Sequence, residues 1–155
     1  MFSLEEQAGI ARSIREKLER GEQVRILPGG VSMLPTFRPE RDIIILSPLP
    51  QTLKKYDVVF YQRSNGKPVL HRIVAVGETY TCLGDNQFQT ERGVKREQMI
   101  GLVTGFIRGG REHSVEELGY RSYCRLWHHT KRLRHIIKYP KYYLRRLLQC
   151  LRFIR

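Results

Sequence analysis

The stretch GGVSMLPTF, residues 29–37, contains the side chain best suited to covalent chemistry, the hydroxyl of Ser32. Gly29 and Gly30 make this turn permissive, and Pro35 stiffens it. A serine hydroxyl is a poor nucleophile unless a general base lies within hydrogen-bonding reach. The question is therefore whether another part of the chain brings a base to this turn.

His71 is the candidate base, in the segment VLHRIVAV of residues 69–76. The alternation of a strand puts its imidazole on the face opposite to Arg72. With an ordinary pKa of about 6.5, an imidazole can accept a proton at neutral pH without a large shift. Asp85, in LGDNQF, follows another predicted strand and is placed to orient the imidazole, and Asn86 beside it is suited to holding that loop.

Residue types alone favour a plainer interpretation of the same positions. A serine in a glycine-rich turn is usually a turn residue, a single histidine in a strand is usually a packing residue, and GDN is a common turn sequence. We interpret Lys54 and Lys55 as solvent-exposed lysines in a turn. Lys67 is the second candidate for the base, after His71.

The elements that must position these residues are an N-terminal helix and a set of short strands. Leucine, isoleucine and alanine at helical spacing predict a helix over residues 3–20, with Ser3 and Glu6 as a capping box. Six strand-like runs follow: QVRILP, DIIILS, DVVFYQ, VLHRIVAV, ETYTCL and MIGLVTGFI. RSNGKP predicts a hairpin turn, and Gly109 and Gly110 mark the expected end of the domain. The predicted fold class is mainly β, a small antiparallel sheet or barrel-like fold with an N-terminal helix.

These motifs resemble those of the signal peptidase I family of serine peptidases. GGVSMLPTF is similar to the family's Gly-x-Ser-Met-x-Pro box, with Gly30, Ser32, Met33 and Pro35 at the matching positions. YDVVFYQRSNGKPVLHRIVAV resembles the segment that carries the base, LGDNQF the Gly-Asp-Asn box, and MIGLVTGFI the closing strand. The boxes occur in the family's order across residues 24–108.

The resemblance implies a member of the S24/S26 superfamily of the histidine type, similar to the endoplasmic-reticulum and archaeal branch. It implies that Ser32 is the nucleophile and His71 the base. The orienting acid is left between Asp85, which we favour, and Glu91. It further implies that the turn around the nucleophile serves substrate and oxyanion binding through Gly30, Met33 and Pro35, with no metal and no organic cofactor.

The positive charge is concentrated at the C-terminal end of the chain. The net charge is +13, yet residues 120–155 contain eleven Lys and Arg and no acid, so residues 1–119 are nearly neutral. We therefore expect an amphipathic helix over 1–22, a catalytic domain over 23–119 and a basic amphipathic tail over 120–155.

The tail has the composition of a helix that lies on an anionic membrane. The apolar residues Leu144, Leu147, Leu148, Leu151 and Ile154 recur at helical spacing, and Pro140 predicts a break between two helices. Packing against the domain is the second interpretation, and nucleic acid is the least favoured partner.

The chain shows neither a secretory signal nor an apolar run long enough to span a bilayer. The relatives' N-terminal transmembrane segment has no counterpart here, and the three cysteines form no CxxC pair. We therefore expect a cytoplasmic protein, peripheral on the inner face of the membrane, that cleaves the leader of a precursor peptide. The alternative is an inactive or regulatory adaptor on the same fold that binds membrane or nucleic acid.

Overall fold

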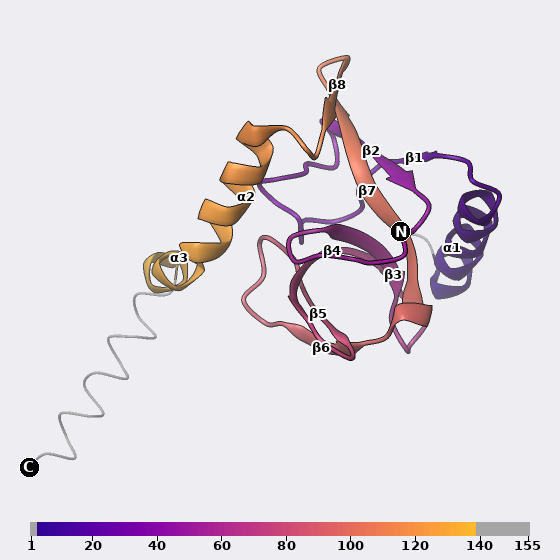
Figure 1. The fold of residues 1–155 in the computed structure, drawn as a ribbon, viewed down its shortest axis with the longest axis horizontal. Coiled ribbons are helices and arrows are strands. Elements are labelled where there is room, and N and C mark those ends of the chain that lie inside the picture. The colour runs from indigo at the N-terminus through magenta and orange to yellow at the C-terminus, as the bar shows by residue number, and fades with distance from the viewer. Residues whose placement is uncertain (1–2, 139–155) are drawn as a thin grey trace, which may run out of the picture.

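A computed structural model describes residues 3–138, which form an N-terminal helix, an eight-stranded sheet and two C-terminal helices (Figure 1). Helix α1 spans Leu4–Glu19, a one-turn 3-10 helix η1 spans Arg96–Gln98, and α2 and α3 span Leu118–His129 and Lys131–Lys138. The strands are β1 (Val24–Ile26), β2 (Asp42–Ser47), β3 (Val58–Gln62), β4 (Pro68–Val76), β5 (Tyr80–Leu83), β6 (Glu91–Val94), β7 (Met99–Arg108) and β8 (Arg111–Ser114).

The sheet is antiparallel and open. Its strand order is β1-β2-β7-β3-β4-β5-β6. Strand β8 pairs with the second half of β7, on the same edge of β7 as β3. The predicted antiparallel sheet is confirmed, but the barrel-like closure is wrong: within residues 3–138 no ladder joins β1 to β6. Closure requires both end strands to pair, and β1, with three residues, pairs along its whole length with β2 alone. The helices at both ends make the fold mixed α/β.

Local signals placed most of the elements correctly. Ser3 and Glu6 form the expected capping box, with the Glu6 N–H donating to the Ser3 hydroxyl at 3.2 Å. Gly66, in the predicted hairpin between β3 and β4, has a φ of 83°. Gly109 and Gly110 turn β7 into β8 with positive φ angles instead of ending the domain. Strands β6 and β8 were not predicted, because their sequences ERGV and REHS are polar and short.

The core lies on both faces of the sheet. One cluster packs α1 and the turn around Met33 against residues such as Leu46 and Phe60. The other lies on the opposite face and includes Val59, Tyr61 and Ile73. The alternation predicted for β4 is confirmed, so consecutive residues of this strand face different clusters.

Helix α2 packs onto the domain across the boundary expected at residue 119. The ring of Tyr120 stacks on Phe37 with centroids 6.2 Å apart, and Cys124 is buried. The first part of the predicted tail thus follows the second interpretation, packing against the domain. The predicted break at Pro140 and the leucine stripe of residues 144–154 lie outside the described residues. None of the described helices is long and apolar enough to cross a bilayer.

We predict that α1 holds the sheet mainly through Leu18, which is 3% exposed and lies over Gly101 of β7. Leu18→Ala should lower the free energy of unfolding by about 2–5 kcal/mol, because it opens a cavity in the core. Leu4→Ala, at a position 51% exposed, is the matched control. Urea unfolding of the two variants measures the difference, and equal midpoints would contradict the prediction.

Candidate active site

Ser32 lies in the turn that connects β1 to β2. The N–H of Leu34 donates to the Val31 carbonyl, and that of Phe37 donates to the Met33 carbonyl, so the chain coils tightly after Ser32. Gly30, just before it, has a φ of 72°, a conformation that glycine adopts at low cost. The side chain of Ser32 is half-buried.

His71 lies in the middle of β4 and is 1% exposed. Its Nδ1 atom lies 3.1 Å from Oε1 of Glu91 and 3.3 Å from the hydroxyl of Tyr61. Tyr61 reaches it from β3, where Val59 pairs with His71 two residues away on the same face. Glu91 reaches it from β6, across Cys82 of β5.

These contacts select one tautomer of the imidazole. The Tyr61 hydroxyl donates to Oε2 of Glu91 at 2.8 Å, so its oxygen faces Nδ1 as an acceptor. The carboxylate of Glu91 is also an acceptor, and both groups therefore favour a proton on Nδ1 of His71. The other ring nitrogen, Nε2, is then left with a lone pair, the form that a general base requires.

The environment keeps His71 neutral and Glu91 charged. Burial lowers the pKa of His71, and the charge of Glu91 opposes this only in part. Burial by itself raises the pKa of Glu91, but hydrogen bonds from Arg63 and Tyr61 outweigh it and hold that pKa below its ordinary value. Arg63 binds both carboxylate oxygens of Glu91, with Nε 2.8 Å from Oε2. The result is a neutral imidazole beside a fixed carboxylate.

Asp85 has a different partner from the one we favoured for it. Both of its oxygens pair with the guanidinium of Arg72, at 2.9 and 2.7 Å, and the Thr36 hydroxyl donates to it at 2.5 Å. Arg72 is on the face of β4 opposite to His71, so Asp85 is drawn to that face. We favoured Asp85 as the acid beside His71, but the structure places Glu91 there and pairs Asp85 with Arg72.

The loop around Asp85 still contributes to the site, by supporting the Ser32 turn. The main-chain N–H of Asn86 donates to the Ser32 carbonyl at 2.8 Å, and its side-chain amide donates to the Val31 carbonyl at 3.1 Å. A Cβ atom on Gly84 would lie 2.7 Å from the same Ser32 carbonyl, so only glycine allows this approach. The expectation that Asn86 holds a loop is thus confirmed.

The Ser32 turn lies against the end of β5, the strand that pairs with β4 beside His71. Leu83, the last residue of β5, pairs with Arg72, the neighbour of His71 on β4, and Gly84 follows it against the Ser32 carbonyl. Within the described chain, no hydrogen bond joins the Ser32 hydroxyl to the His71 imidazole. The structure therefore shows no direct contact between these two side chains.

The other residues that we expected to bind substrate or the oxyanion differ in their exposure to solvent. Met33 is 3% exposed, and its side chain packs in the core beneath the turn. Gly30 is exposed and Pro35 half-buried in the same turn. Among residues 3–138, the main-chain N–H groups of Ser32 and Met33 donate no hydrogen bond, which leaves them available to an oxyanion.

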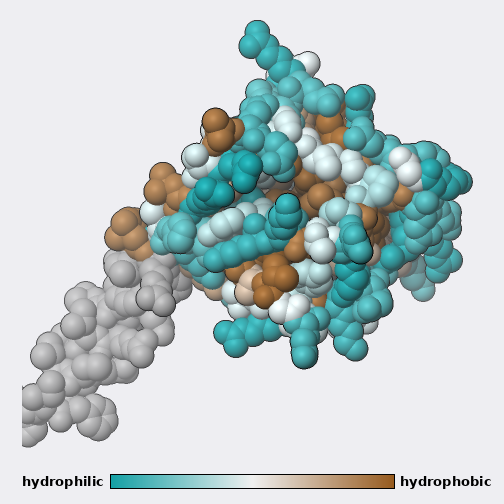
Figure 2. All heavy atoms as spheres, viewed as in Figure 1, coloured by the Kyte–Doolittle hydropathy of each residue, from teal (hydrophilic) through white to brown (hydrophobic). Residues whose placement is uncertain are grey.

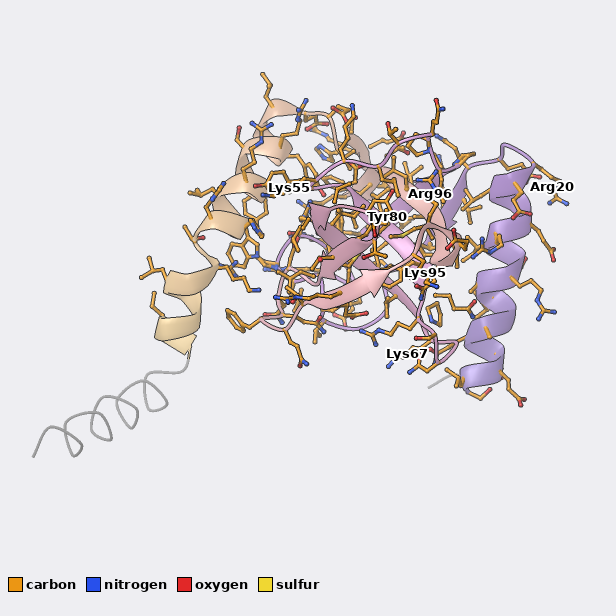
Figure 3. The ribbon with its side chains drawn as sticks, turned by 60° about the horizontal axis from the view of Figure 1, so that its bottom comes forward. Arg20, Lys55, Lys67, Tyr80, Lys95 and Arg96 are labelled. Atoms are coloured by element: carbon orange, nitrogen blue, oxygen red, sulfur yellow. The ribbon has the colours of Figure 1, made fainter. Side chains whose placement is uncertain are left out.

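The remaining candidates fall outside this region. In Figure 3, Lys55 lies on the side of the molecule nearer α2, and Lys67 lies on the other side, near α1, in the β3–β4 turn, where it is exposed. A cavity of about 360 Å³ beneath α2 is lined by Arg72, Tyr120 and neighbouring residues, but by neither Ser32 nor His71. In the described chain, no three His, Cys, Asp or Glu side chains gather as metal ligands.

Comparison of the chain with protein-family models, with curated proteins and with solved structures gives no match in any of the three. The likeness to signal peptidases is therefore a likeness of short motifs, and the case for a function rests on the geometry of the site. Sequence reasoning missed Tyr61 and Arg63 as partners of the site. Val59, Tyr61 and Arg63 alternate along the segment that pairs with β4 through the predicted hairpin. This alternation could have placed both residues on the same face as His71.

We predict that Asp85 contributes mainly to stability. Asp85→Asn leaves the buried guanidinium of Arg72 without its counter-charge, and breaking a buried pair in this way costs about 3–5 kcal/mol. Denaturant unfolding of Asp85→Asn, with the exposed Glu40→Gln as control, measures this loss. A change of Asp85→Asn no larger than the control would show that the ion pair is not structural.

We also predict that the pKa of His71 lies below its ordinary value and that Glu91→Gln lowers it further. Because the folded pKa lies below the unfolded one, the stability from this group is present above about pH 6.5 and is lost as the pH falls through the folded pKa. NMR titration of the His71 ring measures both shifts. Glu22 is exposed and forms an ion pair with Arg20, so Glu22→Gln should leave the His71 pKa unchanged. A Glu91→Gln change that also leaves it unchanged would refute the His71–Glu91 pairing.

Proposed function

We propose that this protein is a serine endopeptidase in which Ser32 is the nucleophile, His71 the general base and Glu91 the acid that orients the base. The observation that carries the proposal is the contact of His71 Nδ1 with Glu91 at 3.1 Å, which leaves Nε2 as the basic nitrogen. The short motifs similar to signal peptidases support the same assignment, and we propose the catalytic fold of that superfamily for residues 24–108.

The reaction that this site would perform is acyl transfer. The Ser32 oxygen attacks the carbonyl carbon of the scissile peptide bond while its proton passes to Nε2 of His71. The C–N bond then breaks, and the leaving amine takes that proton. A water molecule repeats the cycle: it gives a proton to His71 and attacks the ester, and Ser32 is released with its proton restored. Free main-chain N–H groups in the turn would stabilise the oxyanion.

The Ser32 hydroxyl must approach the base before this reaction can begin. Proton transfer needs a separation of about 2.6–3.2 Å, and catalytic hydrogen bonds commonly tighten only when substrate binds. We propose that a peptide adds as a strand at an open edge of the sheet and brings the Ser32 hydroxyl to His71. The outer edge of β1 is unpaired within residues 3–138 and leads directly into the turn.

The substrate that fits this proposal is the leader segment of a precursor peptide. A strand added to the sheet is bound through its main chain, so an extended leader is recognised with little demand on its side chains. We further propose that the protein works at the inner, cytoplasmic leaflet of a membrane, because its basic C-terminal residues are attracted to the anionic lipids found there.

The test is mass spectrometry of new peptide N-termini in membrane-containing lysates. Termini should appear with the wild-type protein and be lost with Ser32→Ala and His71→Ala. Glu91→Gln should slow their formation by about 10,000-fold, as loss of an orienting carboxylate does elsewhere. Ser64→Ala, which removes an exposed serine from the β3–β4 turn, is the matched control and should cleave normally.

Cleavage that survives Ser32→Ala or His71→Ala in the folded variant would refute the proposal. The absence of a hydrogen bond between the Ser32 hydroxyl and His71 favours a second candidate, an inactive adaptor that binds a membrane or nucleic acid through the same fold. Identical N-terminal profiles for wild type and Ser32→Ala, in a lysate that contains candidate precursors, would support this second candidate.

A further inference from the structure

One face of helix α2 packs against the domain. Tyr120 and Cys124 pack toward the sheet, and the indole N–H of Trp127 donates to the Asp85 carbonyl at 2.9 Å. Arg134 of α3 donates to the Trp127 carbonyl, with its guanidinium 3.6 Å from the centroid of the Trp127 ring. These contacts anchor both helices by their inner side.

The outer side of the same helices carries large aliphatic side chains that no described residue covers. Leu118 and Leu126 of α2 are 81% and 65% exposed, and Leu133 and Ile137 of α3 are 58% and 69% exposed. We call these four residues the outer apolar residues. Figure 2 shows hydrophobic side chains projecting along this side of the molecule, over α2 and α3. Isolated exposed leucines are ordinary, but four large aliphatic side chains on two consecutive short helices are a candidate interaction surface.

All formally charged residues after Glu117 are basic, although Leu118, at the start of α2, has the exposed Glu116 and Glu117 beside it in the chain. The last acidic residue of the chain is Glu117, and no Asp or Glu follows it through residue 155. Arg125 directly precedes Leu126 in α2, is exposed and has no partner in the described chain. Arg121, by contrast, pairs with Glu116. A partner that fits this surface must therefore combine a negative charge with an apolar phase.

We propose that the outer apolar residues dock on an anionic phospholipid surface, with Arg125 and its basic neighbours against the headgroups. Aliphatic side chains enter the acyl boundary while cations bind the lipid phosphates, which explains both halves of the surface. Nucleic acid would engage the cations but leave the four aliphatic side chains in water. Packing on the domain is excluded for this side, because the inner side of α2 already makes that contact.

Docking would also orient the candidate active site. Trp127 holds the Asp85 carbonyl, and the next residue, Asn86, holds the Ser32 carbonyl. The membrane-facing helix is thus two contacts away from the Ser32 turn, which would be presented at a defined position relative to the lipid. The proposal does not rest on proteolysis, and the Ser32→Ala protein should bind membranes as the wild type does.

The test is co-sedimentation of the full chain with vesicles of phosphatidylcholine alone or mixed with phosphatidylserine. Binding is expected only with the anionic mixture and should weaken as salt rises. Leu126→Gln combined with Leu133→Gln should weaken binding at least about tenfold, because burial of two aliphatic side chains is lost. Arg125→Gln should weaken it about fivefold, the contribution of one cation near an anionic surface.

The matched control is Val76→Gln, which removes an apolar side chain 51% exposed at the end of β4, away from the C-terminal helices. It should bind vesicles as the wild type does, and circular dichroism should show all variants folded. Equal binding by the leucine variants and the wild type would overturn the proposal. Equal binding to neutral vesicles, or tighter binding to duplex DNA that the leucine changes do not affect, would overturn it as well.

Discussion

The buried ion pair between Arg72 and Asp85 is the interaction on which the rest of the structure depends. It joins the middle of β4 to the loop after β5, and Thr36 and the Tyr56 carbonyl complete its hydrogen bonds. A buried pair of charges tolerates little movement, because separating the two groups would leave an unpaired buried charge that strongly destabilises the fold. The loop is therefore held at one position, and the main-chain contacts of that loop in turn set the position of the Ser32 turn.

The two acidic residues near the site divide its tasks because β4 sends consecutive side chains to opposite faces. Arg72 recruits Asp85 on one face, and His71 recruits Glu91 on the other. The first pair fixes the framework, and the second sets the protonation of the candidate base. The residue that pairs with the structural acid and the candidate base are therefore neighbours in β4. Because their acids lie on opposite faces, substitutions of the two acids should have different effects.

Helix α2 joins the framework to the C-terminal surface. Its inner side meets the Arg72–Asp85 pair through Tyr120, whose ring lies 5.9 Å from the guanidinium, and through Trp127. Its outer side faces water with leucine and arginine. A segment whose composition indicated a separate tail is therefore in part a component of the domain, and only its outer side is available for a partner.

The elements whose signals are local could be predicted from the sequence. These are the capped helix α1, the six apolar strands, the Asn-Gly hairpin and the glycine turn that carries Ser32. The capping side chain, the period of apolar residues and the turn type all act within a few residues, so they can be recognised in a single chain. The alternation of β4 also placed His71 and Arg72 on different faces correctly.

Which acid contacts His71 could not be predicted from the sequence, because that contact depends on strand pairing between distant segments. Polar β6 forms only beside β5, and its register with Cys82 brings Glu91 within reach of β4. Strand β8 and the packing of α2 depend on partners in the same way. The buried Arg72 competes for Asp85 more strongly than a neutral imidazole can, and no spacing in the sequence expresses that competition.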